Sequence, residues 1–245
     1  MGTPMQRDKG FPPTNWDWVE ACRSGSDDHK QQALSMLCSG YWYPVYAYLR
    51  GSGHTPEDAE DLTQGFFVRM LRHDSFSRID RHKGRLRNYL LTSLKHFVFA
   101  EHSARVTPKR GNGALHLPLH VAWAETRLGS ESLEPSHNAT PERLFNQRWL
   151  ALIMDLAMQR LSADYAARGE AELFSRLAVQ LDAGKTEYGS HKILAQELGV
   201  SETSVRVGLV RLKKRLAATI REVIAETVGK ADSVDAELQE VLGLT

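Results

Sequence analysis

Apolar residues recur along most of this chain at the three- and four-residue spacing of an amphipathic helix, and the alternation typical of strands is almost absent. Residues 31–50 show the spacing clearly, with apolar side chains on one side at Leu34, Leu37, Tyr41, Val45 and Tyr48. Pro44 interrupts this segment and predicts a kink or a restart of the helix. The pattern as a whole predicts an all-α protein.

The same periodicity predicts the remaining helices and the division of the chain into domains. Helices are expected at 14–22, 55–72, 86–105, 142–169, 171–184 and across 190–216. Residues 106–140 lack a periodic apolar face and contain several prolines and glycines, so we expect an irregular linker there. The linker separates two helical domains, at 14–105 and 141–229. A flexible N-terminus at 1–13 and a tail at 230–245, which has the composition of a short helix, complete the chain.

Residues 190–216 carry the sharpest local signal, that of a helix-turn-helix. Ile193, Leu194 and Leu198 anchor a short helix, and Gly199 permits a tight turn. Ser201 can cap a second helix, whose buried side is expected at Val205, Leu209 and Leu212. In such motifs the second helix enters the DNA major groove. From His191 to Arg221 there are seven basic residues against two acidic ones, which suits contacts with phosphates. Two packed helices with a solvated basic end are the structural alternative.

A second basic region lies between Lys83 and Arg110, where Glu101 is the only acidic residue. The aromatic residues Tyr89, Phe97 and Phe99 alternate with its charges. Cationic and aromatic side chains together are typical of surfaces that hold single-stranded nucleic acid. Tyr89 and Phe97 also have core spacing with Leu90 and Leu94, so a purely structural role for the aromatic residues stays open.

The helix that begins TPEDAEDLTQGFF, at 55–67, is unusually acidic for a chain with these basic regions. Thr55 can accept a hydrogen bond from the amide of Asp58, and acidic residues near a helix N-terminus are favoured by the helix dipole. An inward side is expected at Ala59, Leu62, Phe66 and Met70, with Phe67 and Leu71 beside it. The other side carries Glu57, Asp58, Asp61, Gln64, Gly65, Val68 and Arg72. This stripe suits a basic protein partner, although an ordinary solvated helix face explains it equally well.

Charge and cysteine content narrow the range of proteins further. The net charge is only +1, so any attraction to DNA must come from local basic surfaces. The two cysteines, Cys22 and Cys38, lack metal-type spacing and fit the reducing cytoplasm. Neither a membrane-spanning run nor a secretion signal is evident. We therefore expect a cytoplasmic protein.

Taken in order, the acidic helix, the basic segment GRLRNYLLTSLKHFVFAEHSAR, the linker and the terminal helix-turn-helix resemble the bacterial sigma-70 family, in particular its extracytoplasmic-function (ECF) type. The resemblance makes 14–105 a sigma-2-like domain and 141–229 a sigma-4-like domain. DAEDLTQGFF is similar to the family's stretch that binds the clamp helices of the polymerase β′ subunit. Tyr89 stands where the family usually has tryptophan, and the segment 142–182 is longer than its usual counterpart.

The resemblance also assigns residues to contacts. Polymerase binding is implied for Asp58, Asp61, Gln64 and Phe67. The promoter −10 element, including a flipped base at the loop DRHKGR, is implied to contact Asp80, Arg81, His82, Lys83, Arg85, Arg87, Asn88, Tyr89, Lys95 and His96. The −35 element is implied to contact Glu202, Thr203, Ser204, Arg206, Val207, Arg211, Lys213 and Lys214.

The resemblance thus implies a sigma factor with core RNA polymerase (β′ clamp helices and β flap) and promoter DNA as partners. No cofactor or metal and no catalytic group is expected, because RNA synthesis is the chemistry of the polymerase. A regulatory partner such as an anti-sigma factor cannot be identified from the sequence. Thr63 lies in the acidic stretch and is a hypothetical phosphorylation site.

Two other functions are compatible with parts of the sequence. A helix-turn-helix regulator would bind duplex DNA without polymerase. A metal-dependent DNA-processing enzyme would use carboxylates such as Asp58, Asp61, Asp74 or Asp80. No further carboxylate is obviously placed to complete such a metal site, which makes the enzyme the weaker alternative.

Overall fold

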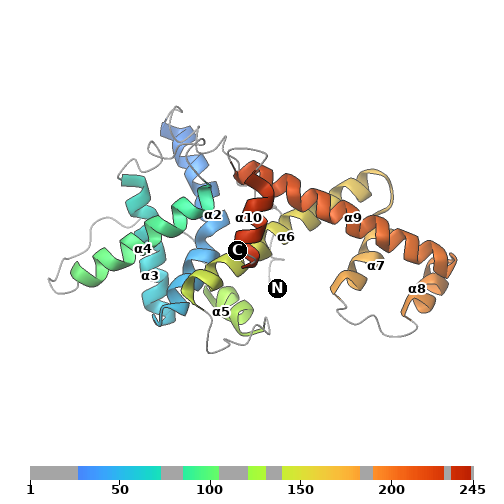
Figure 1. Cartoon of the computed structure of the whole chain (residues 1–245), viewed down its shortest axis with the longest axis horizontal. Helices are drawn as coiled ribbons and strands as arrows, with labels where there is room; N and C mark the ends of the chain where they lie inside the picture. The colour runs from blue at the N-terminus through green and yellow to red at the C-terminus, as the bar shows by residue number, and fades with distance from the viewer. Residues whose placement is uncertain are drawn as a thin grey trace, which may run out of the picture. The chain divides into compact units, whose positions relative to one another are not determined.

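The computed structural model describes residues 27–72, 85–104, 121–130, 140–182, 190–228 and 233–243 (Figure 1). These residues form the helices α2 to α10 and contain no strand, so the predicted all-α class is confirmed for them. The chain divides into two compact units. Unit 1 comprises residues up to Leu152 together with those from Ile224 onward, and unit 2 comprises Ile153–Val223.

In unit 1, α2 (Asp27–Gly51) is a single continuous helix that packs against α3 (Pro56–Arg72). Pro44 lies inside α2, so the restart predicted at this position does not occur. Both neighbours of Pro44, Tyr43 and Val45, are buried, and we attribute the continuity of the helix to packing on all sides of it. The thiol-bearing Cys38 is also buried in this helix, with 2% of its surface exposed.

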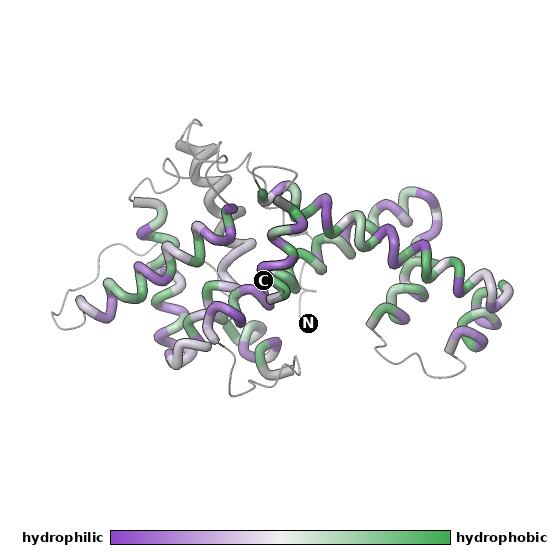
Figure 2. Tube along the Cα trace, viewed as in Figure 1, coloured by the Kyte–Doolittle hydropathy of each residue, from purple (hydrophilic) through white to green (hydrophobic). Residues whose placement is uncertain are grey.

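The start and the inward side of α3 are as predicted. The amide of Asp58 donates to Thr55 Oγ1 at 3.2 Å, which caps the helix. Ala59, Leu62, Phe66 and Met70 are all buried. Figure 2 shows the resulting alternation of apolar and polar segments along the helix.

Two further helices contribute large side chains to the core of unit 1. Leu86, Leu90, Leu94 and Phe97 bury one side of α4 (Leu86–Ala104). The first part of α6 (Pro141–Ala167) contributes the fully buried Trp149, whose indole Nε1 donates to the hydroxyl of Tyr41 at 3.2 Å. The C-terminal tail forms α10 (Ser233–Leu242), so the short helix expected there is confirmed.

A helix that the sequence did not predict, α5 (Val121–Ser130), lies within the segment expected to be an irregular linker. The prediction for 106–140 is therefore wrong at residues 121–130. The ring of Trp123 contacts those of Tyr43 and Trp42 on α2, with centroids 5.0 and 5.9 Å apart. Glu125 accepts hydrogen bonds from α2 as well. Contacts with α2, rather than a long apolar face of its own, stabilise this short helix.

Unit 2 contains the later part of α6, α7 (Ala171–Asp182), α8 (Ser190–Leu198) and most of α9 (Glu202–Thr227). Its core is formed by buried side chains from all four helices: Leu161, Tyr165, Phe174, Leu177, Leu194, Ala195, Val205, Leu209 and Leu212. Gly199 between α8 and α9 has a φ of 63°, the left-handed conformation that the predicted tight turn requires. The two helices and the tight turn predicted within residues 190–216 are therefore present. Gly184, expected to end α7, lies outside the described residues.

Candidate nucleic-acid and protein-binding surfaces

The N-terminal half of α9 presents a polar and basic surface. The hydroxyl of Ser201 accepts a hydrogen bond from the amide of Ser204 at 3.0 Å and so caps the helix as predicted. Seven of the predicted −35 contact residues are exposed, and Glu202 is partly so: Thr203, Ser204, Arg206, Val207, Arg211, Lys213 and Lys214. Arg206 forms an ion pair with Glu202 at 2.6 Å on this exposed face. Arg215 instead contacts α6, where it pairs with Asp164 and lies over the ring of Tyr165.

The outer side of α3 presents the acidic stripe. Asp61 is exposed, and Asp58 and Gln64 are partly exposed. Gln64 Nε2 donates to Glu60 Oε1 at 3.5 Å, one turn earlier. Phe67, which was also assigned to the polymerase contact, is 0% exposed and packs in the core of unit 1. Only the three polar members of the assigned set can therefore reach a partner in this conformation.

The predicted −10 contact residues differ widely in their exposure. Lys95 and His96 on α4 are exposed, whereas Asn88 and Tyr89 are half-buried. Arg87 has only 1% of its surface exposed. Four other members of the set, Asp80, Arg81, His82 and Lys83, lie outside the described residues. Most of the described members on α4 also form polar contacts within unit 1.

Arg87 is held by carboxylates of the C-terminal helix. Its Nε donates to Glu237 Oε1 at 2.6 Å, and its Nη2 donates to Glu240 Oε1 at 2.9 Å. Burial alone would lower the pKa of Arg87, but the hydrogen bonds and charges of these two carboxylates raise it above its ordinary value. Arg87 Nη1 also donates to Asn146 Oδ1 at 2.7 Å, and the guanidinium lies 5.6 Å from the ring centroid of Trp149.

Asn88 on α4 and Arg85, immediately before this helix, contact the same carboxylates. Arg85 pairs with Glu237 at 2.9 Å and also with Glu240, and Asn88 Nδ2 donates to Glu240 Oε2 at 3.4 Å. Burial tends to raise the pKa of Glu240, but the hydrogen bond from Arg87 and the nearby cations outweigh it and hold that pKa below its ordinary value. Glu240 is therefore ionised at neutral pH and can pair with cations.

Lys95, farther along α4, also has an internal acidic partner. Its ammonium lies 2.8 Å from Glu142 Oε1, at the start of α6. This pair is substantially exposed, so it can be exchanged for other ions more readily than the pair between Arg87 and Glu237.

The chain was compared with models of known protein families, with curated proteins and with solved structures. No match is found in any of the three comparisons. The surfaces described above are therefore the evidence on which a function can be proposed.

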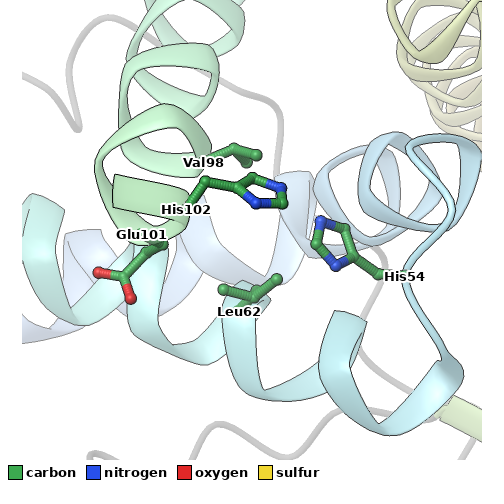
Figure 3. A pocket seen from close by; sticks show the side chains of 5 residues that line it. All are labelled: His54, Leu62, Val98, Glu101 and His102. Atoms are coloured by element: carbon green, nitrogen blue, oxygen red, sulfur yellow. The ribbon is translucent and has the colours of Figure 1, made fainter. Parts of the chain in front are cut away.

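A small pocket between α3 and α4 brings two histidines together (Figure 3). The ring centroids of His54 and His102 are 5.8 Å apart, and Leu62 and Val98 line the pocket beside them. Glu101 lines the pocket, but its carboxylate points away from the two imidazoles (Figure 3). Within the described part of the chain, no cluster of three or more potential ligands is suitable for a metal ion. In that same part, none of the helices has the length and apolar character needed to cross a membrane.

Thr63 is fully buried on α3, and its hydroxyl donates to the carbonyl of Ala59 at 2.6 Å. A kinase requires an accessible hydroxyl, so phosphorylation at this position would require α3 to be displaced. The hypothesis of a phosphorylated Thr63 is therefore disfavoured by the fold.

Sequence reasoning missed the role of Glu237 and Glu240. These acids are spaced by three residues and so share one side of a helix. That spacing was a readable signal for a paired acidic face. The basic partners, about 150 positions earlier in the chain, were not readable from periodicity.

Proposed function

We propose that this protein is an ECF-type sigma factor that binds core RNA polymerase, recognises the promoter −10 and −35 elements and promotes promoter melting. The observation that carries the proposal is the pair of exposed surfaces of opposite charge on two separate units. One is the acidic stripe at Asp58, Asp61 and Gln64, and the other is the basic face of α9. Two surfaces of opposite charge suit two macromolecular partners of opposite charge.

The surface of α9 supports the binding of duplex DNA. Its capped N-terminal end carries exposed polar residues that can reach base edges, namely Thr203, Ser204 and Arg206. Arg211, Lys213 and Lys214 follow on the same helix and are exposed, which suits contacts to phosphates. In the proposed function this helix binds the −35 element.

The basic residues of α4 and of the segment before it would hold the opened strand. Unstacking a base costs a few kcal/mol, and capture of the extruded base by the protein offsets that cost. No catalytic side chain is needed for this step. The acidic stripe of α3 would repel DNA, so we assign it to the polymerase β′ clamp helices, and the β flap is the second expected contact on the enzyme.

One observation favours a different function, that of a helix-turn-helix regulator of duplex DNA. Arg87 is buried and Arg85 is paired, which leaves α9 as the more open basic surface among the described residues. Such a regulator would bind duplex operators tightly by itself. A sigma factor of the proposed type requires the core enzyme.

Run-off transcription with core RNA polymerase on a pool of genomic fragments tests the proposal. Wild type is expected to yield discrete transcripts, and Asp61→Arg is expected to reduce them about tenfold or more, because a like charge then faces the basic partner. Glu172→Arg makes the same change of charge at an exposed position of α7 and serves as the control. Equal transcription by wild type and Asp61→Arg would show that Asp61 makes no important contact with the clamp helices. A chain that does not associate with core enzyme, yet binds duplex DNA alone, would be the regulator.

A further inference from the structure

The C-terminal helix α10 lies against the N-terminal end of α4, the end that the proposed function directs to the opened strand (Figure 1). Two of its acids, Glu237 and Glu240, contact three polar residues on that side of unit 1: Arg85, Arg87 and Asn88. All three belong to the set predicted to bind the −10 element. While α10 is docked, these three groups bind protein carboxylates.

The carboxylates provide the same chemistry that a nucleic-acid backbone would provide. Arg87 uses Nε and Nη2 for the two oxygens of Glu237, at 2.6 and 3.2 Å, in the forked arrangement that arginine also forms with phosphate. Glu240 connects Arg85, Arg87 and Asn88 in the manner of a second anionic group. The acidic side of α10 and a phosphate backbone cannot occupy these positions together.

Ion pairs are prominent in the docking of α10, and its apolar residues Leu238 and Val241 are only partly buried. Among the described residues of this helix, Val234 is the only buried apolar side chain, and Leu242 is 53% exposed. Arg87 keeps separate contacts with Asn146 and Trp149 on α6, which do not involve α10. Departure of α10 would therefore leave Arg87 oriented and exposed to new anions. An interface of this kind weakens when competing phosphates supply the same pairing.

We propose that α10 is an autoinhibitory latch, in which Glu237 and Glu240 occupy the cationic positions of α4 in place of nucleic-acid phosphates. The latch rests on the proposed function, because it assumes that these cations bind the opened strand. Only open molecules bind that strand, so the apparent dissociation constant equals the intrinsic one divided by the fraction of molecules that are open. A permanent structural brace, in which α10 never leaves, is the alternative that an experiment must separate from the latch.

Charge variants of Glu240 in the full chain make that separation. The Glu240 side chain is 39% exposed, so both Glu240→Gln and Glu240→Lys can be accommodated without burying a new group. Glu222→Gln and Glu222→Lys, at an exposed position of α9, are matched controls for the change in net charge. Binding of a labelled mixed-sequence single-stranded DNA of about 20 nucleotides to the free chain is measured by fluorescence anisotropy. The measurement is made at low salt, where contacts with the nucleic-acid backbone are strongest.

The latch predicts that Glu240→Lys binds the single strand about tenfold more tightly than Glu222→Lys does, with Glu240→Gln between Glu240→Lys and wild type. A duplex of the same length should bind wild type and the two Glu240 variants within about twofold, because α9 is the same in these three proteins. Single-strand affinities of the Glu240 variants equal to those of their Glu222 controls would show that α10 is a brace and overturn the latch. If Glu240→Lys does not fold, as judged by circular dichroism, Glu240→Gln against Glu222→Gln decides in the same way.

Association with core RNA polymerase is measured on the same samples. Wild type that fails to bind the core enzyme refutes the proposed function, whereas the single-strand comparison still decides whether α10 covers a binding surface. The two failures are therefore distinguishable.

Discussion

Arg50 on α2 and Glu125 on α5 form a two-pronged ion pair, with Nε to Oε1 at 2.7 Å and Nη2 to Oε2 at 3.1 Å. The hydroxyl of Tyr46 donates to the same Oε1 at 2.7 Å. Hydrogen bonds from Arg50 and Tyr46 hold the pKa of Glu125 below its ordinary range, although burial acts in the opposite direction. Glu125 is thus the polar anchor of α5 on unit 1.

Replacement of this anchor should destabilise unit 1. Glu125→Gln keeps the shape of the side chain but loses its charge, and we expect the free energy of unfolding to fall by about 1 kcal/mol, since the pair is about one-third exposed. Urea denaturation followed by circular dichroism measures the change. Glu222→Gln, which removes a charge from an exposed helical position, should leave the midpoint where it is. An unchanged midpoint for Glu125→Gln would show that α5 docks through its aromatic residues alone.

The effect of pH on stability follows from the direction of the same pKa shift. A carboxyl group whose pKa is lowered on folding contributes stability above its unfolded pKa, about 4.3, and loses it as the pH falls through the folded value. The pKa values of Glu142 and Glu240 are lowered too. The hydrogen bond from Lys95 is the main cause for Glu142. For Glu240, burial acts to raise the pKa, but the hydrogen bond from Arg87 and the nearby cations outweigh it. The free energy of unfolding should therefore decrease as the pH is lowered from about 5. The difference in free energy of unfolding between wild type and Glu125→Gln should disappear over the same range. A gap that stays constant down to pH 3 would contradict this assignment.

Phe67 and Gln64 should respond differently to truncation, although both were assigned to polymerase contact. Phe67→Ala empties a fully buried site and should cost about 3–5 kcal/mol of stability. Gln64→Ala, at a partly exposed site, should change stability by less than about 0.5 kcal/mol and still weaken association with core polymerase. Urea denaturation and co-elution with core enzyme separate the two effects. If Gln64→Ala associates with core polymerase as wild type does, Gln64 is not part of the interface.

Two glycines of unit 2 should give opposite results when replaced by alanine. Gly199 has a positive φ and open space around it, so Gly199→Ala should destabilise the unit by about 1 kcal/mol through backbone strain alone. Gly208 lies inside α9, where an added Cβ would meet Leu177 Cδ1 at 3.4 Å, an ordinary contact. Gly208→Ala should therefore stabilise the unit by up to about 1 kcal/mol through helix propensity. Thermal unfolding of the two variants tests both signs, and two shifts in the same direction would contradict the account of Gly199.

Local features of the fold were predictable because they depend on nearest neighbours in sequence. The caps at Thr55 and Ser201, the turn at Gly199 and the inward side of α3 all follow from residues within one or two helical turns. The helix α5 was not predictable in this way, because only ten residues form it and its anchors lie on α2. The continuity of α2 through Pro44 likewise depends on packing by distant segments.

The candidate surfaces were predictable to a different extent on each helix. Exposure on α9 follows from its period, and seven of its eight assigned residues are exposed. On α4 the sequence identified the basic residues but not their burial, since Arg87 is covered by acids far away in the chain. Periodicity describes one helix at a time and therefore cannot find a partner on another helix.

Because Cys38 is buried, its thiol can serve as a probe of how often unit 1 opens. A thiol that is 2% exposed reacts with an alkylating reagent only when the surrounding helices separate, so its labelling rate in a Cys22→Ser background reports how often they do. Each opening that leads to alkylation leaves a permanent adduct on the chain, and mass spectrometry measures the fraction of chains that carry it.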